Sequence, residues 1–161
     1  MPARTPSRFT PAHLPAIAWA AFIAVALAAP GDALPQWSDE VWLGPWLDPV
    51  LDKVLHFSLF AVLAALAARS FRALDPHGRG RALTRHPLLA AVLAATAYGA
   101  LSELAQHWFT ARTAELGDFG ADVAGALCAA GLVWITRRHA VAEQAAEDSS
   151  DVAATGESGA G

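Results

Sequence analysis

The chain has 161 residues, of which 55% are hydrophobic and 16% charged, with a mean hydropathy of +0.34 and a formal net charge of −4. This composition is too apolar for an ordinary soluble domain of this size, and it indicates a small integral membrane protein with the lipid bilayer as its surroundings. The net negative charge owes much to acidic residues near the C-terminus, and we expect no nucleic-acid partner.

The chain contains four apolar windows, at residues 14–30, 50–70, 87–108 and 119–136. Each approaches the ~20 residues that a helix needs to cross ~30 Å of hydrocarbon. We therefore expect an all-α fold: an integral membrane four-helix bundle over residues 14–137, preceded by a cytoplasmic segment of residues 1–13. Residues 138–161 have almost no bulky apolar groups and cannot bury a core, so a disordered acidic tail is expected there.

The first window has a second interpretation. Arg4 and Arg8, followed by an apolar run and the small residues around Ala28, are also typical of a signal peptide with a cleavage site. Pro30 and Asp32 are equally good helix terminators, which favours a retained helix. Cleavage would leave the topology of the other three helices unchanged.

The basic residues predict the orientation. If the first helix begins in the cytoplasm, nine of the 11 Lys and Arg residues fall on the cytoplasmic side. These are Arg4, Arg8, Arg69, Arg72, Arg79, Arg81, Arg85, Arg137 and Arg138. The positive-inside rule therefore places both termini in the cytoplasm. The two exceptions on the outer side are Arg112 and Lys53, the latter being the only lysine.

The outer side also carries the aromatic residues expected at a membrane interface, namely Trp37, Trp42, Trp46 and Trp108. The lone cysteine, Cys128, has no partner for a disulfide and no metal-ligand spacing, so a small packed core residue is expected. The cytoplasmic loop of residues 71–86 completes the organisation.

Polar residues gather at the outer ends of three predicted helices. They are Asp52, Lys53 and His56 at the start of the second, Glu103 and Gln106 near the end of the third, Arg112 in the following loop, and Asp118 and Asp122 at the start of the fourth. Spacings of three or four place the members of each helix on one face. Gly125 with Ala129, and Ala95 with Gly99, permit close helix contact beneath this cluster.

This ordered set of motifs resembles the VanZ-like family of small bacterial membrane proteins over residues 48–135. The motifs are Asp52-Lys53-x-x-His56-x-x-x-Phe60, Glu103-x-x-Gln106, Arg112 and Asp118-x-x-x-Asp122-x-x-Gly125. The family often has Tyr in place of Phe60 and Asn in place of Asp122. The resemblance implies a multi-pass protein of the bacterial inner membrane, and the family takes its name from an accessory protein associated with low-level resistance to the glycopeptide teicoplanin.

Two functional hypotheses follow from the cluster. In the first, Lys53 and Arg112 bind a phosphate or carboxylate of a lipid-linked or cell-wall molecule, within a ligand-binding set completed by polar neighbours. Those neighbours are Asp52, Gln106, Asp118 and Asp122. In the second, the protein is an enzyme in which His56 exchanges protons and Glu103 acts as acid or base.

A metal-dependent version of the enzyme would draw its ligands from His56, Glu103, Asp118, Asp122 and His107. A third, purely structural hypothesis pairs the charges with one another. Lys53 would then bind Glu103 or Asp122, and Arg112 would bind Asp118 or Glu115, pinning three helix ends together. The sequence leaves open whether a reaction occurs, which cofactor or metal is bound, and what the oligomeric state is.

Overall fold

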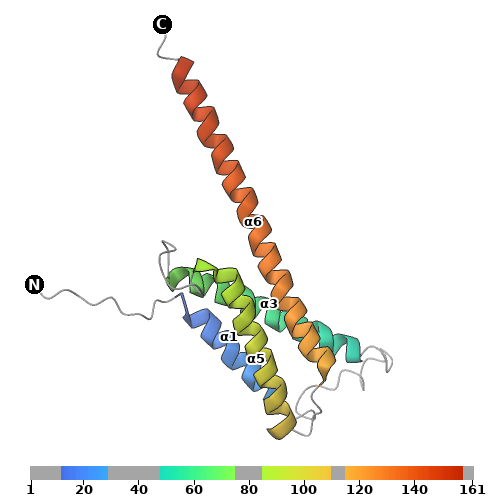
Figure 1. Cartoon of the computed structure of the whole chain (residues 1–161). Helices are drawn as coiled ribbons and strands as arrows, with labels where there is room; N and C mark the ends of the chain where they lie inside the picture. Colours follow the sequence, from blue (N-terminus) through green and yellow to red (C-terminus); the bar gives the residue numbers. More distant parts are fainter. Residues whose placement is uncertain (1–11, 29–47, 75–84, 110–114, 158–161) are drawn as a thin grey trace, which may run out of the picture. The chain divides into compact units, whose positions relative to one another are not determined.

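The protein forms four α-helices in the computed structural model, which describes residues 12–28, 48–74, 85–109 and 115–157 (Figure 1). The helices are α1 (Leu14–Ala28), α3 (Asp48–Leu74), α5 (Pro87–Phe109) and α6 (Leu116–Glu157). Within these ranges there is no strand, so the predicted all-α fold is confirmed. Trp37, Trp42, Trp46 and Arg112 lie outside the described residues, as do most of the predicted cytoplasmic loop and the N-terminal segment.

Three of the helices are long and apolar enough to cross a membrane. The apolar spans are Val50–Leu74 in α3, Pro87–Trp108 in α5 and Leu116–Ser149 in α6, and α1 is a shorter apolar helix. Large apolar side chains such as Leu93 and Leu101 are exposed on the outside of the bundle. In water such exposure would be costly, whereas hydrocarbon is their natural surroundings.

Hydrogen bonds at the two ends of the bundle show how the helices run. The Gln106 side chain donates to the Leu27 carbonyl (3.2 Å), which brings the ends of α1 and α5 together. The Ser70 hydroxyl donates to the Ala12 carbonyl (3.1 Å), which brings the end of α3 to the start of α1. Successive helices therefore run in opposite directions. We call the end that holds the last turns of α1 and α5 and the first turns of α3 and α6 the polar end.

The core is built from bulky residues on α1 and α3 and from small ones on α5 and α6. Its buried members are Ile23, Leu27, Leu59, Phe60, Leu63, Ala64, Ala95, Ala126 and Ala129. Gly125 marks a close approach of α6 to α3, because a Cβ added there would collide with the Phe57 carbonyl. The small residues predicted to permit close helix contact do so at this position.

Helix α6 is longer than the sequence predicted. Residues 138–157, expected to be disordered, continue the helix in the structure, and the side chains from 134 to 149 are all exposed. The absence of bulky apolar groups does exclude a core, but alanine has the highest helix propensity and the segment is rich in it. Cys128 also differs from expectation, since it lies exposed on α6 rather than packed in the core.

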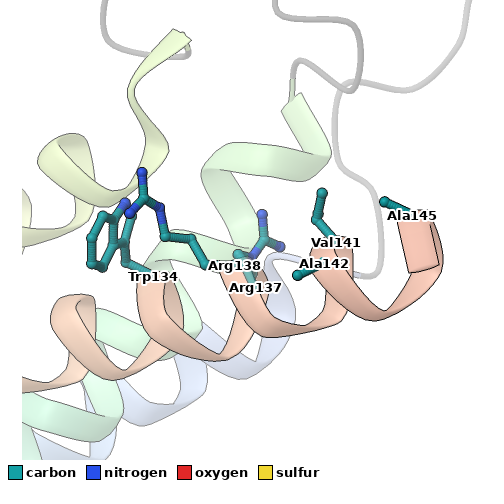
Figure 2. Close-up of a pocket in the computed structure, with 6 residues that line it drawn as sticks. All are labelled: Trp134, Arg137, Arg138, Val141, Ala142 and Ala145. Atoms are coloured by element: carbon teal, nitrogen blue, oxygen red, sulfur yellow. The ribbon is translucent and has the colours of Figure 1, made fainter.

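The chain divides after Ala130 into two compact units, and the second consists of the later part of α6. In this unit the Arg138 guanidinium lies over the Trp134 ring, 4.3 Å from its centroid (Figure 2). The groove in Figure 2 is lined by residues of α6 alone, from Trp134 to Ala145, so it is a feature of one helix surface. A tryptophan beside arginines is typical of the boundary between hydrocarbon and headgroups.

Candidate functional site

The outermost contact of the polar end is made by Lys53. Its Nζ lies 3.0 Å from Asp118 Oδ1 and 3.4 Å from Glu115 Oε2. The side chains of Lys53 and Glu115 are 40% and 58% exposed, whereas that of Asp118 is 12% exposed. Gly117 makes room for this arrangement, because a Cβ there would lie 2.9 Å from Lys53 Cε.

The partners of Lys53 differ from those that the sequence predicted. The purely structural hypothesis paired Lys53 with Glu103 or Asp122, but Lys53 reaches Asp118 and Glu115 instead. The reason is depth: Lys53 lies three residues before His56 on α3, which corresponds to about 4.5 Å along the helix axis. Asp118 lies in the first turn of α6, where the helix dipole favours its negative charge.

A buried histidine–aspartate pair lies beneath the lysine. His56 Nδ1 and Asp122 Oδ1 are 2.9 Å apart, and the two side chains are 2% and 0% exposed. Asp122 has room because α5 carries Gly99 opposite it: a Cβ there would lie 2.9 Å from Asp122 Oδ2. Phe60, one turn beyond His56 on α3, is also fully buried, and its ring centroid lies 6.1 Å from that of Tyr98 on α5. The neighbouring Asp52 is half-buried.

Glu103 of α5 is the third buried ionisable group. Its Oε2 accepts a hydrogen bond from the Glu115 backbone N–H at 3.2 Å, which ties the end of α5 to the start of α6. Its Oε1 is buried and has no hydrogen-bond partner among the described residues, and the same holds for Asp122 Oδ2. Two carboxylate oxygens are thus desolvated without compensation, which is costly for charged groups.

The donor atoms of His56, Glu103 and Asp122 lie within 4.8 Å of one another, and all three residues are buried. A second group with the same spacing consists of Asp52, His56 and Asp118. His107, considered as a further ligand from the sequence, is exposed and belongs to neither group. The first group would hold a cation between three helices, α3, α5 and α6, and the second would hold one between α3 and α6.

Most of the predicted site residues meet at the polar end. Asp52, Lys53, His56, Glu103, Asp118 and Asp122 are brought together there. Gln106 is buried and binds the Leu27 carbonyl of α1, and Arg112 lies outside the described residues. The role of Gly117 was missed, and Gly99, which was predicted to permit close helix contact, also leaves room for the Asp122 carboxylate. A glycine one helical turn before Glu103, and another next to Asp118, were the available signals.

A small pocket opens beside Glu103. It has a volume of about 160 Å³ and is lined by Ala100, Glu103, Glu115, Leu116 and Phe119. Its walls are largely apolar, with the two carboxylates as polar exceptions. The pocket is smaller than the roughly 300–1,000 Å³ of small-molecule sites, and it has few polar groups that could fix the orientation of a ligand.

These features define a multi-pass helical membrane protein with a buried polar site at one end of its bundle. The chain matches the family model of VanZ/LLP1 over residues 9–137, most of its length, and it belongs to this family. The resemblance drawn from the motifs is thereby confirmed. Neither the comparison with curated proteins nor the comparison with solved structures gave a match.

Proposed function

We propose that the polar end binds the anionic headgroup of a lipid-linked molecule of the cell envelope, and that it does so from the outer side of the bacterial inner membrane. One observation carries this proposal: buried ionisable side chains from α3, α5 and α6 converge at a single end of an otherwise apolar bundle. Ionisable groups within a membrane are costly and are usually functional. Small residues and aromatic groups alone would suffice to pack these helices.

The outward orientation is supported by the arginines of the opposite end. Arg69 and Arg72 lie in the last turns of α3, and Arg85 lies just before α5. Basic residues favour the cytoplasmic side, so the polar end would face outward and both termini would be cytoplasmic. A cell-envelope ligand would then have direct access to the site.

Lys53 is the described residue best placed to bind an anion. Its side chain is partly exposed, and its contact with the more exposed Glu115 is longer than its contact with Asp118. A phosphate could therefore replace Glu115 while Asp118 continues to hold the lysine. Arg112, in the connection between α5 and α6, would supply a second, bidentate contact.

Binding of a polyprenyl phosphate to the purified full-length protein in nanodiscs tests this function. We expect Lys53→Ala to weaken binding at least about tenfold, since a charge-assisted hydrogen bond contributes roughly 1.5–3 kcal/mol. Arg69→Ala is the matched control, because it removes an exposed basic residue from the opposite end. Equal affinities of wild type and Lys53→Ala would contradict the proposal.

A second candidate function is chemical modification of the bound molecule. The observation that favours it is the buried His56–Asp122 pair next to Glu103, since a carboxylate that orients a histidine is a common arrangement for proton transfer. Mass spectrometry of the polyprenyl phosphate recovered from the same nanodiscs would detect a product. An unchanged lipid with wild type would exclude turnover of this probe.

The proposed link to glycopeptide susceptibility is a separate question, which is measured in cells. The teicoplanin sensitivity of cells that produce wild type is compared with that of cells that produce Lys53→Ala.

A further inference from the structure

The buried part of the polar end has an unbalanced charge. Lys53 is engaged by Asp118 and Glu115, so it does not neutralise the deeper carboxylates of Glu103 and Asp122. Together with His56 these two groups occupy the space between α3, α5 and α6. We propose that His56, Glu103 and Asp122 form a binding site for a divalent first-row metal ion, Zn²⁺ or Mn²⁺.

The geometry fits a shared ion. Ligand atoms at about 2.0–2.2 Å from one small cation lie roughly 3–4 Å from each other. His56 Nδ1 and Asp122 Oδ1 are already 2.9 Å apart, and Glu103 has an oxygen within 4.8 Å of both partners. Small side-chain rotations therefore suffice to bring the three donors onto one ion.

The unpartnered oxygens point to the same site. Glu103 Oε1 and Asp122 Oδ2 have no hydrogen-bond partner among the described residues. Both residues are more than nine-tenths buried, so bulk water does not replace the missing partner. Gly99 preserves the space around Asp122 Oδ2, which a side chain on α5 would fill. A divalent cation would offset two buried negative charges whose only described basic neighbour is His56, since no described lysine or arginine forms an ion pair with them.

The donor set narrows the identity of the ion. Imidazole suits zinc and other first-row metals, whereas carboxylates also suit manganese. Calcium and magnesium prefer sites made only of oxygen, so a histidine with two carboxylates disfavours them. The three helices supply three ligands, and a remaining position on the ion could bind the phosphate of the lipid-linked molecule. Only this last role rests on the proposed function; the metal site itself does not.

Metal analysis of the full-length protein, purified in detergent with a tag that contains no histidine, tests the site. After incubation with ZnCl₂ or MnCl₂ and desalting, we expect about one ion per chain in wild type. Glu103→Gln should bind the metal at least about tenfold more weakly than wild type does. Changes to residues that only support a ligand already weaken metal sites by 10–100-fold, and Glu103 would be a ligand itself. Glu143→Gln is the control, since it makes the same chemical change at an exposed position of α6.

Both variants are nearly isosteric, and their folding is checked by helical circular dichroism and size-exclusion chromatography. Should Glu103→Gln fail to fold, a second measurement on wild type tests the metal site. After wild type is stripped with EDTA, its thermal unfolding midpoint should rise when ZnCl₂ or MnCl₂ is added. Wild type without bound metal and without such a rise would overturn the proposal, as would full metal retention by a folded Glu103→Gln. If wild type binds the metal but does not bind polyprenyl phosphate, the proposed function is overturned and the metal site is not.

Discussion

At the scale of single residues, two glycines decide how closely α6 approaches its neighbours. Gly125 lets α6 lie against the backbone of α3 at Phe57, and Gly99 leaves room on α5 for the Asp122 carboxylate. Close backbone approach through small residues is a main source of helix association in membranes, where the hydrophobic effect does not drive helices together. The same contacts that pack the helices therefore position the buried carboxylate.

Gly125→Ala should destabilise the protein. The added methyl group would collide with the Phe57 carbonyl, which cannot move without shifting α3, so we expect a loss of about 1–3 kcal/mol. Thermal unfolding in detergent, followed by circular dichroism, measures this as a lower midpoint. Gly120→Ala serves as the control because no atom lies within 4 Å of the position that its methyl group would take, so its midpoint should be unchanged or higher. Equal midpoints for the two variants would refute the role assigned to Gly125.

The individual pairings were harder to predict than the cluster. Spacing of three or four showed that Asp52 and His56, and likewise Asp118 and Asp122, share a face of their helices. It could not show how far each helix is shifted along its axis relative to the next. That shift decides that His56, rather than Lys53, meets Asp122.

At the scale of helices, α1 is held to the bundle by side-chain hydrogen bonds to and from its neighbours. Trp19 Nε1 donates to the Leu59 carbonyl (2.9 Å), and the Tyr98 hydroxyl donates to the Ala20 carbonyl (2.6 Å). Ile23 is completely buried in the core. A helix this well integrated has the contacts of a permanent member of the fold.

We therefore expect α1 to remain in the mature protein rather than to be removed as a signal peptide. Its loss would leave the Tyr98 hydroxyl without its Ala20 partner and open the core around Ile23. The intact mass of the protein purified from membranes checks this, and N-terminal sequencing gives the first residue. A mature chain that begins just after Ala28 would show that the contacts of α1 are dispensable.

The helices themselves were largely predictable, since a run of about 20 apolar residues has few alternatives in a membrane. Their ends were less so. The apolar window of α6 stops near residue 136, yet the helix continues to Glu157 because alanine-rich sequence keeps the backbone helical after hydropathy falls. Hydropathy marks where a helix leaves the hydrocarbon, and helix propensity marks where it ends.

At the scale of the whole molecule, the basic residues and the polar end both bear on the proposed orientation in the membrane. The arginines of the described segments around the end of α3 and the start of α5 lie opposite the site. Under the positive-inside rule, this arrangement favours the proposed placement of the site on the outer surface.

Cysteine labelling in intact cells tests this orientation. In a Cys128→Ala background, a membrane-impermeant maleimide should label Leu116→Cys at the polar end but should label Leu74→Cys only after cells are broken. Both positions are exposed leucines near helix ends, so the two variants are matched. If only Leu74→Cys is labelled in intact cells, the topology is the opposite of the proposed one, and the site has no direct access to an envelope ligand.

The order of the helices along the chain has a consequence for biogenesis. Asp122 belongs to the last helix, whereas His56 and Glu103 belong to helices that are synthesised earlier. Until α6 inserts, the membrane must accommodate a histidine that lacks its Asp122 partner, which is unfavourable. Insertion of α6 completes the site and supplies the partner of His56 in one step. A chain interrupted before α6 would therefore lack part of the site and would also expose a polar group to lipid, which offers membrane quality control a means to distinguish unfinished copies from finished ones.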